Sequence, residues 1–377
     1  MLSAVGIIAE YNPFHNGHAY QLQLAKQRTN ADVVVAVMSG NWVQRGAPAI
    51  VDKWVRTEMA LAMGVDLVVE LPVFDAVQPA DLFARGAVRI VDQLQCDSLA
   101  FGCEHADYDF AQLGRIAVDD DQAHFRDYQQ PYPALIQAAI NEQFGININQ
   151  PNDILALNYA QAVHQLDSKM QLVPIERVGS RHHDADFNGA LASASAIRKA
   201  ILSRSIKTVQ PYLPAPVYSL LQNHNYLDLS AFWSIIRYQL VMTPLDELNQ
   251  RYQMTEGLEY RLKEAAIKHA KFKEFMSAIK TKRYTYSRLQ RLLVYVLLQA
   301  NQDDFIHHDP YLRVLGFNPT GQQYLNQVKS QIDWPIISKI DQSMLKSVIK
   351  TEFNAGMLIQ MKNGQYQDLY RHPIIKK

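Results

Sequence analysis

The strongest chemical signal in this chain is a pair of histidines, His15 and His18, that follows an apolar run and an Asn-Pro turn. The apolar run, Gly6–Ala9, is typical of a buried strand, and a helix is expected to begin near Asn16. The first turn of a helix offers free N–H groups and the positive end of the helix dipole. Two imidazoles three residues apart share one face of that turn and can donate hydrogen bonds to phosphate. These residues therefore predict a phosphate-binding turn.

The same two histidines also have a structural interpretation, in which one caps the helix and the other packs against the strand. For an isolated pair of histidines, this is the favoured interpretation. Gly17 lies between them and permits close approach of a ligand to the backbone, and the preceding strand places the pair where phosphates often bind. Together these features favour a binding site.

A second candidate phosphate site is the helix start at Ser193–Arg198, where a serine is a good N-cap and an arginine follows it. Ser195 and Arg198 are the polar groups that this segment offers to a ligand. A capping serine and a surface arginine are the alternative explanation. The histidine pair strengthens the interpretation of this segment as a binding site, because two phosphate-binding helix starts can bind one nucleotide.

The loop Ser39–Gly46 is a third candidate region, because it follows the second expected strand and its glycines permit tight backbone geometry. Arg45 in this loop, and Lys53 and Arg56 after it, offer positive charge to an anion. A flexible loop with ordinary surface charges is the alternative. The sequence alone does not separate these two interpretations.

The elements that must position these residues follow from the hydrophobic pattern, which alternates apolar runs with amphipathic segments. The run Val33–Val37 is apolar without alternation, as in parallel strands covered on both faces. Strands are expected at Ala4–Ala9, Val33–Met38, Leu67–Leu71, Ser98–Phe101 and Leu172–Ile175, with helices between them. Ligands of such sheets bind at the carboxyl ends of the strands. There the segments Asn12–His18, Ser39–Ala47, Glu70–Pro72 and Gly102–His105 would converge.

The chain divides into two regions at prolines 211, 214 and 216, where the alternating pattern ends. Before them, a helix from Ile154 to Leu166 is expected, with Asn152 or Asp153 as its N-cap. Beyond them we expect helices with short connections. The predicted fold is α/β: a Rossmann-like parallel-sheet domain over residues 1–205 and a mainly α-helical C-terminal domain over residues 206–377.

Composition limits the functions that are possible. The 377 residues suffice for two domains with sizeable cores. Lys plus Arg and Asp plus Glu both number 37, so the net charge is zero and any basic surface must be local. Cys96 and Cys103 lack the spacing of zinc or redox sites, which favours buried free thiols in a reducing compartment. No basic leader and no apolar run of about 18 residues occurs, so we expect a soluble, cytoplasmic protein without a membrane partner.

Basic residues concentrate in the segment 263–291, where only Glu264 and Glu274 oppose them. Clustered cations contact phosphate, and tyrosines between them can stack on unpaired bases. A solvated helix face is the usual explanation of a lysine run. In a neutral chain, however, this cluster is the best local candidate for contact with RNA. The residues expected to bind are Lys280, Lys282, Arg283, Tyr284, Tyr286 and Arg288.

Several motifs resemble known families. The H-x-G-H of His15–His18, after a first strand, resembles the nucleotide-binding signature of the nucleotidyltransferase and class I aminoacyl-tRNA synthetase superfamily, and Ser195–Arg198 resembles the later Ser/Thr-x-Ile-Arg signature. The chain is more closely similar to the bacterial tRNA(Met) cytidine acetate ligase family. That similarity rests on GIIAEYNPFHNGH, SGNWVQRG, DLVVELP, FGCE, PNDIL and, in the second region, TKRYTYSR.

The resemblance implies a nucleotidyltransferase-like ligase. Its substrates would be ATP, acetate and elongator tRNA(Met). Such an enzyme activates acetate with ATP to acetyl-adenylate and acetylates the wobble cytidine, forming N4-acetylcytidine. His15 and His18 would be the catalytic pair that contacts the phosphates. We expect Mg²⁺ to accompany ATP, and Glu10, Glu70 and Glu104 are the carboxylates to test as its ligands, although each could be a structural acceptor.

The resemblance also implies an ATP-binding set that runs through the first motif and continues at four later positions. Without it, Asn152 would be a helix cap and Arg177 a surface ion-pair residue. The implied ATP-binding residues are Ile7, Ile8, Ala9, Glu10, Tyr11, Asn12, Pro13, Phe14, His15, Asn16, Gly17, His18, Ala19, Tyr20, Gly102, Asn152, Arg177 and Ser195.

Two alternatives remain beside this function. A metabolic nucleotidyltransferase that transfers AMP to a phosphorylated cofactor precursor would use the first region and leave the basic second region unexplained. A non-catalytic RNA-binding module would use the second region and leave both phosphate signatures unexplained. The ligase is the hypothesis that uses both.

Overall fold

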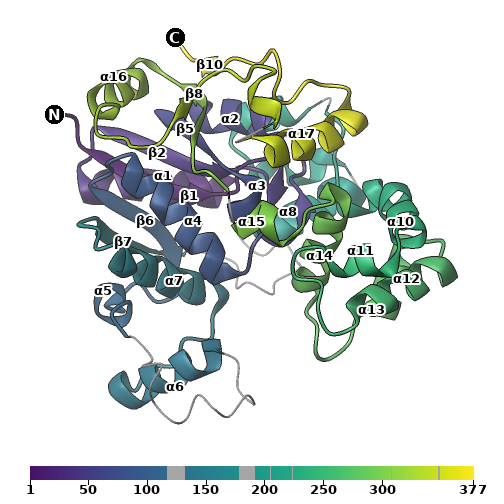
Figure 1. Cartoon of the computed structure of the whole chain (residues 1–377). Coiled ribbons are helices and arrows are strands. Elements are labelled where there is room, and N and C mark those ends of the chain that lie inside the picture. The colour runs from purple at the N-terminus through teal and green to yellow at the C-terminus, as the bar shows by residue number, and fades with distance from the viewer. Residues whose placement is uncertain (117–131, 178–191, 204, 223, 307, 347–348) are drawn as a thin grey trace.

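The computed structural model describes residues 1–116, 132–177, 192–203, 205–222, 224–306, 308–346 and 349–377. Within these residues the centre of the molecule is an eight-stranded sheet in the order β10-β8-β5-β2-β1-β6-β7, with β9 paired to β8 (Figure 1). The strands are β1 (Ala4–Ala9), β2 (Val33–Ser39), β5 (Leu67–Leu71), β6 (Ser98–Cys103), β7 (Gln171–Glu176), β8 (Leu312–Phe317), β9 (Ile336–Ile337) and β10 (Ile374–Ile375). All strands expected from the sequence are confirmed.

The parallel part of the sheet is covered on both faces, as the unbroken apolar runs predict. Along β2, Val33, Val35 and Val37 belong to one core, whereas Val34 and Ala36 belong to the other. The first core packs against α4 (Ala80–Gln93) and α7 (Pro151–Gln165). The second packs against α1 (Asn16–Thr29), α2 (Lys53–Ala62), α8 (Ala194–Ser203) and α9 (Ala215–Leu221). The doubly covered α/β fold is therefore confirmed.

A third core belongs to the helical part of the molecule, which Figure 1 shows in green to one side of the sheet. This core is not separate from the sheet region, because Trp42, which follows β2, is fully buried in it against Phe232. The helices are α10 (Trp233–Met242), α11 (Leu245–Asn249), α12 (Leu258–Lys268), α13 (Phe272–Ile279), α14 (Tyr286–Leu298) and α15 (Gln302–Ile306). The remaining helices are α3 (Val73–Ala76), α5 (Phe110–Leu113), α6 (Tyr132–Phe144), α16 (Pro319–Val328) and α17 (Lys350–Asn363).

The C-terminal region departs from the expected run of helices. Strand β8 pairs antiparallel with β5, and β10 then pairs with β8, so the end of the chain returns to the sheet. The strand was missed because Arg313 and Gly316 interrupt the apolar pattern of Leu312–Phe317. In the fold, Arg313 is only 1 % exposed, and Gly316 lies under α2. The helical part is thus narrower than the predicted range 206–377.

Candidate active site

The turn after β1 positions the two histidines through a helix cap. Helix α1 begins at Asn16, as expected, with His15 as its N-cap in an extended conformation. The backbone N–H of Gly17 donates to Nδ1 of His15 at 3.0 Å, and the backbone N–H of His15 donates to Nδ1 of His18 at 3.3 Å. Each ring therefore satisfies a free N–H of the helix start, in the reciprocal manner of a capping box.

This cap also determines where each imidazole holds its proton. Burial, together with the positive charges of Arg177 and Arg198, lowers the pKa of His15 to about 3. Burial, then His15 and Arg177, lower the pKa of His18 well below its ordinary value. Both rings are neutral near pH 7, and because each Nδ1 accepts a hydrogen bond, the proton must lie on Nε2. The turn thus offers two Nε2–H donors.

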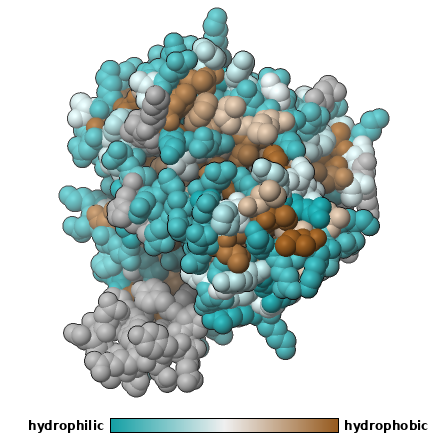
Figure 2. All heavy atoms as spheres, turned by 45° about the vertical axis from the view of Figure 1, so that its right-hand side comes forward, coloured by the Kyte–Doolittle hydropathy of each residue, from teal (hydrophilic) through white to brown (hydrophobic). Residues whose placement is uncertain are grey.

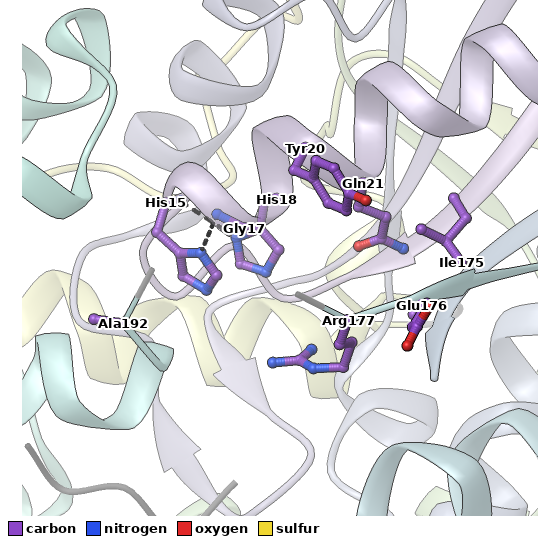
Figure 3. Close-up of a pocket in the computed structure, with 10 residues that line it drawn as sticks. His15, Gly17, His18, Tyr20, Gln21, Ile175, Glu176, Arg177 and Ala192 are labelled. Atoms are coloured by element: carbon purple, nitrogen blue, oxygen red, sulfur yellow. Dashed lines mark hydrogen bonds between the residues drawn. The ribbon is translucent and has the colours of Figure 1, made fainter. Parts of the chain in front are cut away.

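The two donors line a pocket at the carboxyl ends of β1, β6 and β7 (Figure 3). The rings of His15 and His18 are stacked, with centroids 3.8 Å apart, and Figure 3 shows Arg177 facing the same space. The pocket is lined by His15, Gly17, His18, Tyr20, Gln21, Gly102, Ile175, Glu176, Arg177 and Ala192. Of the residues expected to bind ATP, the fold brings His15, Gly17, His18, Tyr20, Gly102 and Arg177 together here.

The second phosphate signature packs directly against the first. Arg198 donates from Nη1 to the backbone oxygen of Asn12 at 2.7 Å and from Nη2 to Oγ of Ser195 at 3.1 Å. The cap of α8 is formed by Ser193, whose Oγ accepts from the N–H of Ala196 at 3.1 Å, and not by Ser195. Ser195 is therefore free of capping and orients an arginine that holds the histidine turn.

Most other members of the first motif build the turn instead of facing the pocket. The side chains of Ile7, Ala9, Tyr11 and Phe14 are buried in the core beneath α1, so any contact they make with a nucleotide must come from their backbone. The same holds for Ile8, which packs into the core on the opposite face of the sheet. The polar members make internal bonds: Asn12 Oδ1 accepts from Ile50 N, Glu10 Oε1 accepts from Gln44 N, and Asn16 Nδ2 donates to Pro211 O.

The start of α7 corrects the predicted helix cap. The N-cap is Gln150, so Asn152 and Asp153 lie inside the first turn. Asn152 Nδ2 donates to Oε1 of Glu104 at 2.5 Å, and Asp153 Oδ1 accepts from the backbone N–H groups of Glu104 and His105. These bonds tie α7 to the end of β6. This pairing could not be predicted from a local pattern, because the partners are 48 or 49 residues apart.

Two basic residues expected to bind an anion are instead buried and bonded to other groups of the protein. Lys53 Nζ, which is completely buried, lies 2.8 Å from Glu70 and 2.7 Å from Asp368. Arg56 donates to the backbone oxygens of Glu10, Ser39, Gly40 and Val51, and so joins the ends of β1 and β2. Glu70 is thereby also removed as a Mg²⁺ ligand, because its carboxylate is paired and buried.

The predicted RNA-binding segment lies around the start of α14. Tyr286 is half exposed, and Lys280 lies over its ring at 5.8 Å. Tyr284, however, is only 7 % exposed and donates from its hydroxyl to Glu256, which also pairs with Arg283 at 2.6 Å. This burial argues against the predicted stacking on a base, since Tyr284 packs inside the loop and bonds to Glu256. Lys282 is exposed, and Arg288 lies over the Tyr284 ring at 5.0 Å.

Three smaller expectations concern the whole chain. Cys96 and Cys103 are buried free thiols, as predicted. Among the described residues, no helix is long and apolar enough to cross a membrane. The same residues contain no group of three or more His, Cys, Asp or Glu side chains arranged to hold a metal ion.

Comparison with known proteins agrees with this geometry. The family model described as HIGH Nucleotidyl Transferase matches residues 2–371. A tRNA(Met) cytidine acetate ligase of Levilactobacillus brevis is 49% identical over 377 residues, covering 100% of this chain and 98% of the relative, and one of Limosilactobacillus reuteri is 44% identical with 99% and 100% covered. The crystal structure of Thermotoga maritima TmcAL bound with alpha-thio ATP matches with a TM-score of 0.88, 27% identity and 99% of each chain covered.

Proposed function

Since this chain belongs to the HIGH nucleotidyl transferase family and, within it, to the tRNA(Met) cytidine acetate ligases, we propose that it acetylates the wobble cytidine of elongator tRNA(Met). Acetate would be activated by ATP as acetyl-adenylate, and the product would be N4-acetylcytidine. The relative with bound alpha-thio ATP supports a nucleotide in the corresponding pocket here. The proposed place of action is the cytoplasm.

The observation that carries this proposal is the pair of neutral histidines with both Nε2–H groups available beside Arg177 and Arg198. In the first step, an acetate oxygen would attack the α-phosphorus, and the bond from this phosphorus to pyrophosphate would break. Acetate is already deprotonated, so this step needs no general base. Alignment and stabilisation of the charge on the departing pyrophosphate are sufficient, and hydrogen-bond donors with cations provide them.

In the second step, the cytidine N4 amine would attack the acetyl carbonyl carbon. The new C–N bond replaces the C–O bond to AMP, AMP leaves with the electron pair of that bond, and the amine loses one proton. No covalent enzyme intermediate is required. This agrees with the pocket lining, whose described residues include histidines and an arginine but no serine or cysteine.

Mg²⁺ would be held chiefly by the phosphates of ATP, as is usual for this ion. Glu10 and Glu104 lie at the carboxyl ends of β1 and β6, and each already accepts hydrogen bonds from neighbouring residues. The chemistry of these carboxylates fits a contribution to the ion, whereas that of Glu70 does not. When bound, the ion would neutralise charge on the pyrophosphate.

The two regions of the chain would divide the work. We assign ATP and acetate to the region through residue 205, and tRNA chiefly to the region beyond it. The surface that Figure 2 brings forward, which includes the helical part, intersperses hydrophilic and apolar side chains. Such a mixture suits nucleic acid, which offers both phosphates and base faces. Lys280, Lys282, Arg283, Tyr286 and Arg288 are the proposed contacts.

The test is to incubate the purified protein with ATP, Mg²⁺, labelled acetate and bulk tRNA, and to measure N4-acetylcytidine by nucleoside mass spectrometry. We expect label in this nucleoside only when ATP is present, and only in elongator tRNA(Met) when tRNAs are tested singly. Acetate-dependent exchange of labelled pyrophosphate into ATP reports the first step without tRNA. Intact, unacetylated tRNA together with transfer of AMP to a small phosphorylated acceptor would identify the protein as a metabolic nucleotidyltransferase instead.

A further inference from the structure

The hairpin of β3 (Trp42–Val43) and β4 (Ala47–Pro48) holds a single exposed arginine, Arg45, at its tip. The hairpin is firmly anchored, because Trp42 is completely buried and donates from Nε1 to the backbone oxygen of Ala355 at 3.1 Å. Gly46 closes the turn in the left-handed region, with φ of 75°, and donates to the backbone oxygen of Val43 at 2.9 Å. The position of the arginine backbone is therefore defined by the fold.

The residue before the arginine attaches the hairpin to the nucleotide site. Gln44 donates from its backbone N–H to Oε1 of Glu10 at 3.0 Å, and from its side chain to the backbone oxygen of Gln78 at 3.1 Å. Glu10 directly follows β1 and lies in the segment that leads into the histidine turn. Burial lowers the pKa of the Arg198 guanidinium, and the nearby positive charge of Arg45 acts in the same direction. Arg45 is thus at the edge of the candidate active site.

Arg45 is not neutralised there. Within the part of the chain that the structure describes, its side chain has no hydrogen bond and no ion pair. Glu10 is the nearby carboxylate that favours the charged form of Arg198, and one of its oxygens is already bonded to Gln44. Two guanidinium groups therefore share a location with one partly engaged carboxylate, which leaves excess positive charge for an anionic ligand.

The other side of the hairpin lies against the helical part. A Cβ atom on Gly46 would lie 2.2 Å from the backbone nitrogen of Arg291, so the hairpin and α14 are in direct backbone contact. Burial lowers the pKa of Arg291, and the charge of Arg288, one turn earlier on α14, acts in the same direction, while Tyr295 and Asp81 oppose the shift. The hairpin thus bridges the nucleotide site and the predicted RNA-binding segment.

The direction from which an acceptor can approach agrees with this. The nucleotide pocket is lined from β6 and β7, on one side of β1. The hairpin follows β2, on the other side of β1. When a nucleotide occupies the pocket, the β2 side of the site therefore remains open, and the acceptor can approach from there. Arg45 lies on that side, between the pocket and α14.

We propose that Arg45 joins a cationic track, formed with Arg198 and Arg288, along which a single RNA strand reaches the nucleotide, and that its guanidinium binds a phosphodiester of that strand beside the reacting base. This inference rests on the proposed function for the identity of the strand. Arginine suits the task, because its planar donors match two phosphate oxygens at once. Arg283 contributes less than Arg45, since Glu256 already pairs with it.

The test compares Arg45→Ala and Arg45→Lys with a control, Lys329→Ala. Lys329 is an exposed cation that follows α16, a helix beyond the end of β8, and it is no part of the proposed track. The affinity of elongator tRNA(Met) is measured over a range of salt concentrations, and acetyl transfer is followed over a range of tRNA concentrations. Acetate-dependent exchange of pyrophosphate into ATP is measured without tRNA.

For Arg45→Ala we expect kcat/KM for tRNA to fall about ten-fold, and the slope of log affinity against log salt to shrink by about 1. Arg45→Lys should recover the salt slope but only part of the acetyl-transfer rate, because an ammonium cannot bind bidentately. The exchange reaction should change far less than acetyl transfer. Lys329→Ala should match the unmodified protein in every measurement.

Two results would overturn the inference. If Arg45→Ala lowers pyrophosphate exchange as much as acetyl transfer, Arg45 acts on ATP or acetate. If it matches Lys329→Ala in tRNA affinity and salt slope, no phosphate contact exists. Failure of the proposed function looks different, since the unmodified protein would then neither exchange pyrophosphate nor acetylate tRNA. Even then, the salt slope with RNA would still test the track.

Discussion

Two clusters of ionisable residues lie at the carboxyl edge of the same sheet. One is buried and paired within the protein, whereas the other lines a pocket. The buried cluster consists of Lys53, Glu70, Glu352 and Asp368, at the ends of β2 and β5. The open cluster consists of His15, His18, Arg177 and Arg198, around β1, β6 and β7. The difference between them shows how a single sheet edge can be closed on one side and can bind a ligand on the other.

The buried cluster is closed because its lysine finds carboxylates from distant parts of the chain. Glu352 and Asp368 come from the C-terminal region and are at most 2 % exposed. Glu352 also accepts from the backbone N–H of Val73 at 2.6 Å, which ties α17 to the end of β5. Burial and the neighbouring carboxylates raise the pKa of Glu352, while Lys53 acts against this shift. The cluster joins α17 to the sheet, and its lysine is paired with carboxylates of this chain.

Carboxylates lie near the open cluster, but among the described residues they form no ion pair with it. Among the ion pairs of the described residues, none includes a member of this cluster. Burial lowers the pKa of Arg177 and of Arg198, although nearby carboxylates oppose the shift. A site with positive charge and partly desolvated donors is prepared for an anion. The comparison suggests that the absence of an internal partner, and not the residue type, marks the binding side.

The largest effect that would test this comparison is on stability, from Lys53→Met. Removal of the lysine leaves three buried carboxylates without a paired cation, since the nearby Arg313 forms no ion pair with them, and this should destabilise the fold by about 3–5 kcal/mol. Guanidinium or urea denaturation would measure the loss, with Lys329→Ala as the control that removes an exposed cation. A loss below about 1 kcal/mol would show that Lys53 is not the centre of the buried cluster.

For His18→Asn we expect a smaller loss of unfolding free energy than for Lys53→Met, but a large loss of reaction rate. The Asn oxygen can replace Nδ1 as the acceptor for the His15 N–H, whereas the Nε2–H donor is lost. Acetate-dependent pyrophosphate exchange should fall about 10²–10³-fold, as for loss of one donor that stabilises transition-state charge. The free energy of unfolding should change by no more than the roughly 1 kcal/mol of a helix cap.

His18→Gln is the matched variant for that prediction. Its amide nitrogen can replace Nε2 as a donor, while the cap is lost. It should therefore keep more of the exchange rate than His18→Asn and lose more stability. Equal rates for the two variants would refute the assignment of Nε2 as the functional atom.

The smallest expected effect is the dependence of stability on pH. Burial holds the pKa of His15 near 3, far below the ordinary 6.5, so the folded protein stays neutral at this position where the unfolded chain takes up a proton. The contribution to stability is complete above pH 6.5 and is lost as the pH falls. At pH 5.5 the loss amounts to about 1 kcal/mol for such a ring. Glu352 has a raised pKa, so its contribution changes in the opposite direction, being complete at low pH and lost as the pH rises.

Denaturation midpoints at pH 5.5 and 7.5 would measure this effect. His15→Asn should lose less stability between pH 7.5 and 5.5 than the unmodified protein, because Asn does not titrate. Glu352→Gln, in contrast, should leave the histidine contribution in place. If His15→Asn and the unmodified protein lose the same stability on acidification, His15 is not buried in the neutral form.

Local patterns predicted much of the fold. The apolar runs of β1, β2 and β5 are long and lack alternation, so strand positions were predicted to within a few residues. The helices expected beyond the prolines are also present, among them α12, α13 and α14. Strand β8 was not predicted, because its arginine and glycine interrupt the apolar pattern. Only the surrounding residues of the sheet explain why they are accommodated there.

The sequence by itself determined the histidine turn, the strand that precedes it, and the family resemblance. It did so because these signals are contained in short, contiguous segments. Only the tertiary structure decided which cations are paired inside the protein and which can still bind a ligand. Lys53 and Arg45 are eight positions apart and equally basic, yet Lys53 meets Asp368 from the end of the chain and Arg45 meets no carboxylate partner among the described residues. The reason is physical: ion pairing depends on distance in space, to which a linear pattern of charges is blind.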